Sequence, residues 1–236
     1  MILSVKNLSK HYIVKYGALK RSKRIIQAVD DVSLTIEKGD TLCLVGESGC
    51  GKTTLARMII RLIKPTAGEI MFNGENVTHL KNKHLENFRR HVQIVFQDPY
   101  SSLDPRFTIR RTIKEGMALA TGKYRSDQAK ELRAQEMMRA VGLDQNMLIR
   151  YPHEFSGGER QRIALARALS LNTKLLILDE AVSSLDVIIQ QELLDLLRDV
   201  QKQFELTYLF ISHNLKVVKQ ISNKIAVMYQ GNIVEL

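Results

Sequence analysis

The feature that most constrains the fold is a short apolar run followed by a glycine-rich turn. The run Thr41–Val45 leads into Gly-Glu-Ser-Gly-Cys-Gly-Lys-Thr-Thr at residues 46–54. Apolar residues then recur with helical spacing, at Leu55, Met58, Ile59 and Leu62. Pro65 and Gly68 predict where that helix ends. A buried strand, a glycine turn and an amphipathic helix in this order predict an α/β chain with a mainly parallel sheet.

The rest of the chain repeats the alternation of short apolar runs and helical patterns. The predicted strands are 2–5, 32–36, 41–45, 69–72, 92–96, 174–178, 207–211 and 225–229. A second amphipathic helix begins near Asp186, with Ile189, Leu193, Leu196, Leu197 and Val200 on one face. Between residues 98 and 155 the strand signals disappear and helical patterns such as 127–141 replace them. The sequence therefore predicts one domain, 1–236, in which an α/β core (1–97 and 156–236) carries a helical subdomain (98–155).

The net charge and the apolar content limit the function classes. The chain has 236 residues, and 35 lysines and arginines against 25 aspartates and glutamates give a formal charge of +10. This charge suits nucleic acid or an anionic membrane surface, but the densest basic run, 20–24, is typical of a solvated loop. We expect a cytosolic chain, since no apolar run is long enough to span a membrane and no secretory segment is found. Cys43 and Cys50 are expected to stay reduced, because a disulfide would distort the glycine turn.

The glycine turn matches the pattern G-x-x-x-x-G-K-[ST] through Gly46, Gly51, Lys52 and Thr53. Glycines let successive backbone N–H groups point at phosphate oxygens, and the N-terminus of the next helix adds partial positive charge. Lys52 is predicted to reach the β- and γ-phosphates of a nucleotide, and the Thr53 hydroxyl to bind Mg²⁺. A glycine turn with a chance lysine is the alternative, which the flanking strand and helix disfavour. The predicted phosphate cradle, called the phosphate loop below, comprises Gly46, Glu47, Ser48, Gly49, Cys50, Gly51, Lys52, Thr53 and Thr54.

Two adjacent carboxylates end another apolar strand. Asp179 and Glu180 follow four apolar residues, and the carboxyl end of a parallel strand is where an α/β sheet binds its ligand. Asp179 is predicted to hold Mg²⁺, and Glu180 to orient the attacking water or accept its proton. The alternative is that the two acids merely cap the next turn.

Gln97 and His213 also follow apolar strands. The Gln97 amide is a candidate contact for Mg²⁺ or the attacking water, and the His213 imidazole is a candidate contact for the γ-phosphate. Either residue alone is more typical of a polar strand end. Their positions after successive core strands favour the catalytic interpretation.

Residues 155–169, Phe-Ser-Gly-Gly-Glu-Arg-Gln-Arg-Ile-Ala-Leu-Ala-Arg-Ala-Leu, resemble the signature sequence of the ATP-binding-cassette ATPases. Ser156 is a helix N-cap residue, and Gly157 and Gly158 leave backbone N–H groups bare at the helix start. The segment is therefore a second candidate anion site. With the other motifs, the resemblance covers nearly the whole chain.

The resemblance implies a phosphate-loop (RecA-like) core with an N-terminal antiparallel β subdomain and a head-to-tail dimer. Each ATP is then held between the phosphate loop of one subunit and the signature of the other, Ser156, Gly157, Gly158 and Glu159. Asp186 resembles the residue that links the two sites across the dimer. Tyr12 resembles the aromatic residue that stacks on adenine, with Tyr16 as its competitor and an ordinary strand tyrosine as the alternative for both.

Three features depart from the family's usual pattern. Glu159 replaces a glutamine, which adds negative charge near the phosphates and is expected to slow turnover. Asn214 follows His213 where aspartate is usual. The sequence ends at Leu236, without the C-terminal extension of many close relatives.

Residues 96–106, Phe-Gln-Asp-Pro-Tyr-Ser-Ser-Leu-Asp-Pro-Arg, resemble a segment of the peptide and nickel importers, and the insertion between Tyr12 and Val29 favours the same group. Ala181 after Glu180 resembles the nickel-type second ATPase subunit. The resemblance implies a peripheral ATPase on the cytoplasmic face of the membrane, using ATP and Mg²⁺ to import nickel, a metal chelate or short peptides. Its expected partners are a homologous ATPase (a heterodimer, or alternatively a homodimer), two permeases and, indirectly, an extracytoplasmic binding protein. No nucleic acid is expected; the alternatives are an exporter subunit and a cassette ATPase acting on nucleic acid.

Overall fold

The computed structural model describes residues 1–16, 22–98, 102–117, 124 and 126–236. Lys20 and Arg21 of the basic run lie outside these residues, and so do residues 99–101 of the importer-like segment. The side chain of Tyr16 is also outside the description. The chain divides into two compact units, residues 1–89 with 207–236, and residues 90–206.

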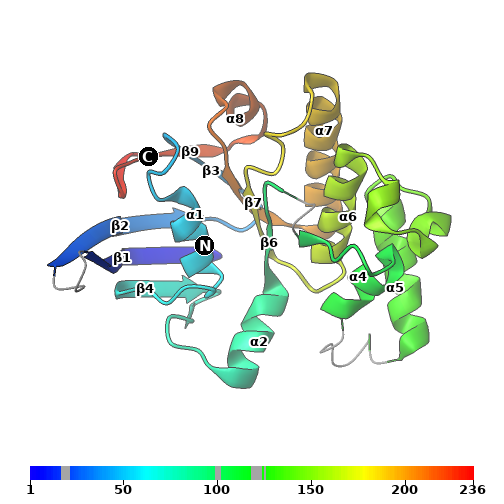
Figure 1. The fold of residues 1–236 in the computed structure, drawn as a ribbon, viewed down its shortest axis with the longest axis horizontal. Helices are drawn as coiled ribbons and strands as arrows, with labels where there is room; N and C mark the ends of the chain where they lie inside the picture. The colour runs from blue at the N-terminus through cyan, green and yellow to red at the C-terminus, as the bar shows by residue number, and fades with distance from the viewer. Residues whose placement is uncertain (17–21, 99–101, 118–123, 125) are drawn as a thin grey trace. The chain divides into compact units, whose positions relative to one another are not determined.

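The first unit contains an antiparallel sheet in the order β2-β1-β4-β5. Its strands are β1 (Leu3–Tyr16), β2 (Ser22–Ile36), β4 (Ala67–Phe72) and β5 (Glu75–Asn76), and Figure 1 shows the first three side by side. The predicted strands 2–5, 32–36 and 69–72 are confirmed, but β1 and β2 extend much further than predicted. Their outer halves carry apolar side chains such as Ile13 and Ile25 that stay exposed, so no buried run marks them in the sequence.

The second sheet of this unit places β3 (Thr41–Val45) in parallel between β8 (Thr207–Ile211) and β9 (Lys224–Tyr229). Every residue of β3 and β8 is buried, as expected for parallel strands covered on both faces. A strand that was not predicted, β10 (Asn232–Glu235), pairs antiparallel with β9. Helix α8 (Leu215–Ile221) connects β8 to β9. The parallel core of the predicted fold is thus present around β3.

Helix α1 (Lys52–Ile59) follows the phosphate loop and buries Leu55, Ala56, Met58 and Ile59. The prediction that its apolar face continues to Leu62 is wrong, because the helix stops at Ile59 and Leu62 is 52% exposed. Arg61 adopts a left-handed φ of 60°. The N–H groups of Arg61 and Leu62 bond back to the carbonyls of Met58 and Arg57. This is a Schellman C-cap with arginine in the place that glycine usually takes.

The second unit begins within helix α2 (Asn82–His91) and contains two parallel strands, β6 (Val92–Val95) and β7 (Leu175–Asp179). Its helices are α4 (Ile109–Gly116), α5 (Asp127–Ala140), α6 (Gly157–Leu169) and α7 (Val187–Phe204), with 3-10 turns at Gln145–Ile149 and Pro152–Glu154. The predicted helix 127–141 is confirmed as α5. In α7 the buried residues are Leu193, Leu194, Leu197 and Val200, so Leu194 takes the buried place predicted for Leu196. That residues 98–155 form a subdomain of their own stays a prediction.

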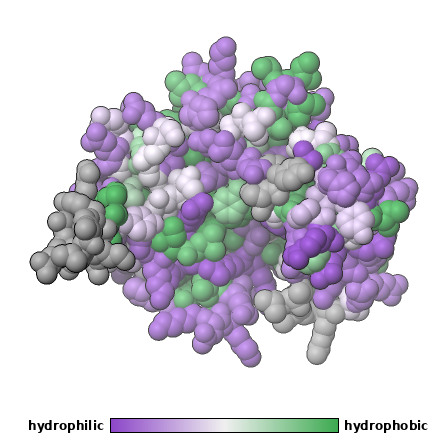
Figure 2. Space-filling model, in the orientation of Figure 1, coloured by the Kyte–Doolittle hydropathy of each residue, from purple (hydrophilic) through white to green (hydrophobic). Residues whose placement is uncertain are grey.

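Two surface properties bear on function. The face drawn in Figure 2 is mainly hydrophilic, with apolar surface in separate patches. Among the residues that the structure describes, no helix is both long enough and apolar enough to cross a bilayer.

Candidate functional site

The phosphate loop lies in the first unit, where two of its glycines touch neighbouring backbone. A Cβ atom added to Gly46 would lie 2.1 Å from the Met228 carbonyl oxygen, and one added to Gly51 would lie 2.2 Å from that of Ala28. Both glycines also have φ values in the left-handed region, 153° and 112°. No other residue fits these positions without displacing β2 or β9, so the glycines of the motif are required by the local fold.

Lys52 is the buried cation of this loop, with 5% of its surface exposed. Its Nζ donates to the carbonyl oxygens of Gly46 (2.8 Å) and Glu47 (2.7 Å) and lies 3.7 Å from Sγ of Cys50. All three partners are uncharged, so the ammonium charge is not neutralised by these contacts. A buried ammonium beside a helix N-terminus is an attractive place for a phosphate group. Glu47, Ser48 and Gly49 are exposed at the tip of the loop, while Thr53 and Thr54 are half-buried in the first turn of α1.

Tyr12 and His213 belong to the same unit. Tyr12 lies on β1 opposite Ile26, the residue is 38% exposed, and Nζ of Lys10 lies 5.1 Å from its ring centroid. Tyr12 is therefore accessible to a flat base, and Lys10 makes a cation–π contact with its ring. His213 is exposed two residues after β8. The unusual Asn214 caps α8, since its side chain accepts from the Lys216 N–H at 3.0 Å.

In the second unit, the ends of β6 and β7 bring Gln97 and the two acids to one sheet edge. Val95 pairs with Leu178, so Gln97 and Glu180 each follow that pair by two residues. Asp179 is 5% exposed at the end of β7. Glu180 has a left-handed φ of 51°, and its carbonyl accepts from both the N–H and the hydroxyl of Ser183. A non-glycine residue held in this strained conformation is a common feature of functional sites.

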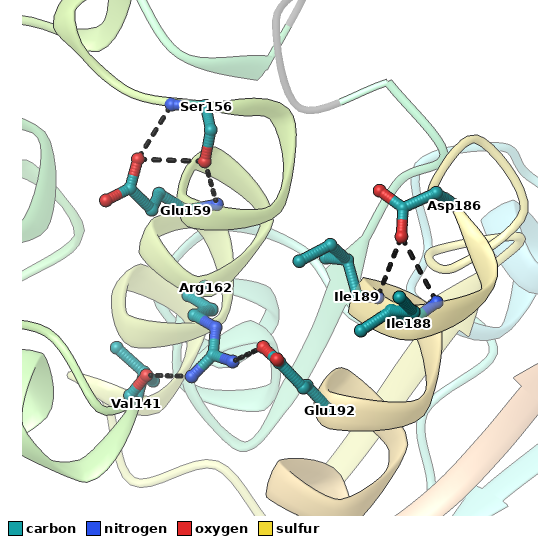
Figure 3. Close-up of polar contacts among 8 residues, drawn as sticks. All are labelled: Val141, Ser156, Glu159, Arg162, Asp186, Ile188, Ile189 and Glu192. Atoms are coloured by element: carbon teal, nitrogen blue, oxygen red, sulfur yellow. Dashed lines mark hydrogen bonds and ion pairs between the residues drawn. The ribbon is translucent and has the colours of Figure 1, made fainter.

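Residues 156–159, called the signature turn below, form a reciprocal cap at the start of α6 (Figure 3). Ser156 Oγ accepts from the Glu159 N–H at 3.3 Å, and Glu159 Oε2 accepts from the N–H and the hydroxyl of Ser156, both at 2.8 Å. These bonds lower the pKa of the Glu159 carboxyl, the backbone bond from Ser156 first. The Gly157 and Gly158 N–H groups occupy the first two helical positions, which have no intrahelical acceptor.

Helix α7 begins beside the signature turn in the same unit (Figure 3). Oδ1 of Asp186 caps it, accepting from the N–H groups of Ile188 (3.1 Å) and Ile189 (3.0 Å). A Cβ atom added to Gly158 would lie 2.6 Å from Cγ2 of Ile189. The structure therefore packs the start of α7, which Asp186 caps, against the signature turn of the same chain.

Arg162 is a site residue that the sequence did not single out. Its guanidinium donates to the Val141 carbonyl (3.2 Å) at the end of α5 and pairs with Glu192 (3.2 Å) on α7 (Figure 3). It thereby joins three helices around the signature turn. Its spacing from Glu159 places it on the same side of α6, but nothing in the sequence identifies Glu192 as its partner.

The predicted residues fall into two groups by unit. The phosphate loop, Tyr12 and His213 lie in the first unit; Gln97, the signature turn, Asp179, Glu180 and Asp186 lie in the second. Thr53, Gln97 and Asp179 carry oxygen donors of the kind that Mg²⁺ prefers. Within the described ranges, no three histidine, cysteine, aspartate or glutamate side chains cluster as a metal site. The roles of the site residues stay predictions.

Comparisons with known proteins agree with the motifs and the fold. The family model described as "ABC transporter" matches residues 29–183. Over its full length the chain is 47% identical to the probable peptide ABC transporter ATP-binding protein y4tS of Sinorhizobium fredii, of which it spans 66%. It is 46% identical to the oligopeptide transport ATP-binding protein AppF of Bacillus subtilis, of which it spans 71%.

A solved structure supports the same assignment. The structure of the ATP-binding cassette MJ0796, a dimer in a post-hydrolysis state with ADP and Pi bound, superposes with a TM-score of 0.85 at 27% identity. The superposition covers 99% of this chain and 97% of that one. From the family match and these relatives, the chain belongs to the ABC transporter family and is one of its ATPases.

Proposed function

We propose that the chain is the ATP-hydrolysing subunit of an importer for short peptides, acting on the cytoplasmic face of the cell membrane. The observation that carries the proposal is a pair of phosphate-attracting elements in one chain. One is the buried ammonium of Lys52, whose contacts with Gly46, Glu47 and Cys50 are all uncharged, and the other is the signature turn with its two glycine N–H groups. Since one ATP has a single γ-phosphate, each nucleotide is gripped by the phosphate loop of one subunit and the signature turn of another. The dimeric state of the solved cassette bound to ADP and Pi supports this arrangement.

The nucleotide is proposed to bind along the first unit. Tyr12 stacks on the adenine, and the phosphate loop holds the phosphates through its N–H groups and Lys52. When bound, Mg²⁺ neutralises charge on the β- and γ-phosphates, and Thr53, Gln97 and Asp179 would hold it. Glu180 orients the attacking water and accepts its proton, and His213 contacts the γ-phosphate.

The transport partners are inferred from the family resemblance. The y4tS and AppF proteins are named for peptide and oligopeptide transport, which supports peptides as the transported cargo. Such a subunit works with a second, homologous ATPase or with a copy of itself, and with two permeases in the membrane. An extracytoplasmic binding protein that delivers the peptide completes the assembly. Closure of the ATPase dimer on ATP, and its opening after hydrolysis, then drives the permeases.

Nickel or a metal chelate is the second candidate cargo. The residue that favours it is Ala181 after Glu180, because this position resembles the nickel-type ATPase subunit. Neither relative described above is named for nickel. Uptake of labelled dipeptide and of labelled nickel in a strain that lacks the gene separates the two, and the loss of nickel uptake alone would reverse our preference.

The catalytic part of the proposal is tested by Glu180→Gln. The change removes the proton acceptor, so ATP turnover should fall by roughly 10²- to 10⁴-fold. ATP binding should persist, and the closed dimer should accumulate in size-exclusion chromatography with ATP, with or without a coexpressed homologous ATPase. Glu75→Gln changes an exposed carboxylate on β5 in the same way and is the matched control. An ATP turnover rate close to that of the unsubstituted protein would show that Glu180 is not the catalytic base.

The transport part is tested by copurification from membranes. We expect the chain to be recovered with a pair of permeases and the binding protein. Recovery with membrane subunits of an exporter would overturn the importer assignment while leaving the ATPase assignment intact.

A further inference from the structure

Glu159 occupies the helix end that the proposed function assigns to the γ-phosphate of a partner's ATP. Its Oε2 accepts from both the N–H and the hydroxyl of Ser156, at 2.8 Å each (Figure 3). A serine hydroxyl has one proton to donate. While that proton is shared with Glu159, Ser156 has neither of its donors available for a phosphate oxygen.

The charge of Glu159 adds to this occupation. The bonds from Ser156, with the nearby cations Arg150 and Arg162, lower the pKa of its carboxyl, so the group is an anion at neutral pH. Arg162 is engaged with the Val141 carbonyl and Glu192. An anion in the first turn stabilises the helix end by the same electrostatic attraction that a phosphate would use. The side chain and a phosphate group therefore compete for one positive helix end.

A second capping carboxylate in the same unit provides a structural comparison, because a different residue follows the one that it caps. Oε2 of Glu154 accepts from the Tyr151 N–H at 2.6 Å, in the turn just before the signature turn. The next residue there is Pro152, which has no N–H to offer a phosphate. In the signature turn, by contrast, the capped residue is followed by two glycines. Glu159 therefore caps a turn with N–H groups that could bind an anion, whereas the residue after the one that Glu154 caps has no N–H.

We propose that Glu159 is an internal competitor of the γ-phosphate and sets the ATP concentration at which the dimer closes. The proposal rests on the function proposed above and deepens it. ATP must displace the Glu159 carboxylate from Ser156 before the signature turn can bind the γ-phosphate. Glu159 therefore raises the ATP requirement for closure and leaves the nucleotide affinity of the chain's own phosphate loop unchanged.

The test is Glu159→Gln in the Glu180→Gln background, which holds the closed dimer. Glutamine keeps the reciprocal cap but carries no charge, so the fold of α6 is retained. The half-saturating ATP concentration for closure should fall by about two- to tenfold, and the difference should shrink as salt rises from low to high ionic strength. ATP binding to the isolated chain should not change. The readout is the dimer fraction in sedimentation velocity across an ATP titration, with thermal unfolding to confirm the fold.

The control is Glu154→Gln in the same background, which removes one negative charge from the neighbouring cap. We expect no change in its half-saturating ATP concentration. An equal effect of the two variants, or no effect of Glu159→Gln while the Glu180 variant closes normally, would overturn the inference and leave the proposed function standing.

Failure of the Glu180 variant to close with ATP, alone or with a coexpressed homologue, would instead count against the proposed function. The inference is then tested by ¹⁵N NMR of the ADP-saturated chain titrated with inorganic phosphate. The Gly157 and Gly158 amide signals should shift, and Glu159→Gln should lower the phosphate concentration required. Unshifted signals, or equal concentrations for the two proteins, would contradict the competition.

Discussion

Gly158 and Ile189 meet so closely that a Cβ atom on the glycine would lie 2.6 Å from Cγ2 of the isoleucine. The contact joins the second residue of α6 to the first turn of α7, which Asp186 caps. Because Ile is branched at Cβ, its Cγ2 cannot move aside without a change of rotamer. The signature turn and the start of α7 are therefore expected to move as one body.

This packing predicts the effect of Gly158→Ala. The overpacked methyl group should cost about 1–3 kcal/mol, which lowers the melting temperature by roughly 2–12 °C for a chain of this size. Gly157→Ala is the control, because its Cβ would lie 3.9 Å from the nearest atom, Cδ2 of Leu185. Differential scanning calorimetry measures the melting temperatures of both variants. Adding Ile189→Ala to Gly158→Ala should cost less than the sum of the single changes, and strict additivity would contradict the contact.

Ser156→Arg should separate nucleotide binding from dimer closure. The substitution removes the N-cap and places a large side chain over the signature turn, so closure of the Glu180→Gln variant with ATP should be lost. Binding of ATP to the phosphate loop of the same chain should change by less than about twofold. Ser126→Arg is the control, since Ser126 caps α5 in the same way. Fluorescent-nucleotide titration measures the binding, and loss of binding would show that the signature turn has been misassigned.

Lys52→Ala tests the phosphate loop. The variant loses the buried ammonium that bonds to the carbonyls of Gly46 and Glu47. Because charge-assisted hydrogen bonds to phosphate oxygens are lost with it, ATP affinity should fall by roughly ten- to hundredfold. Lys81→Ala removes an exposed lysine of the same unit and should leave the affinity unchanged. Isothermal titration calorimetry measures the ATP affinity of both variants, and equal affinities would refute the assignment of Lys52 to phosphate binding.

Cys43 is predicted to resist alkylation in the folded chain. Burial in β3 raises the pKa of its thiol to about 12 from 9.0, against a smaller opposing effect of a hydrogen bond with Ser222. At pH 8 the reactive thiolate should be roughly a thousandfold scarcer than in a free cysteine. In a Cys50→Ser variant, mass spectrometry should find Cys43 modified by iodoacetamide only after unfolding. Rapid labelling of the native protein would contradict the buried placement.

The same shift has a consequence for stability. Because the pKa of Cys43 is higher in the folded chain, the thiol of the unfolded chain ionises first as the pH rises. The contribution of Cys43 to the free energy of unfolding is therefore complete below pH 9 and is lost as the pH rises toward 12. The urea midpoint should therefore fall less steeply above pH 9 when Cys43 is replaced by alanine. If the urea midpoint fell equally steeply in both proteins, groups other than Cys43 would be responsible for the loss of stability at alkaline pH.

The phosphate loop was predictable from sequence because its motif is contiguous. The strand before it, the glycines within it and the helix after it follow one another directly in the chain. Helix α5 and the start of α7 were predictable for the same reason, since Ser126 and Asp186 cap them and the apolar spacing follows the helical period. The end of α1 was not, because a left-handed arginine at position 61 carries no sequence signal of its own.

The sequence by itself determined the family, the parallel core around β3, and the chemistry that each motif carries, since these depend on short stretches of residues. The tertiary structure decided the contacts between stretches that are distant in sequence: Gly158 against Ile189, Arg162 with Glu192, and the glycines of the phosphate loop against Ala28 and Met228. Such contacts depend on how whole elements pack and on which donors are left unpaired, and spacing along the chain does not specify either.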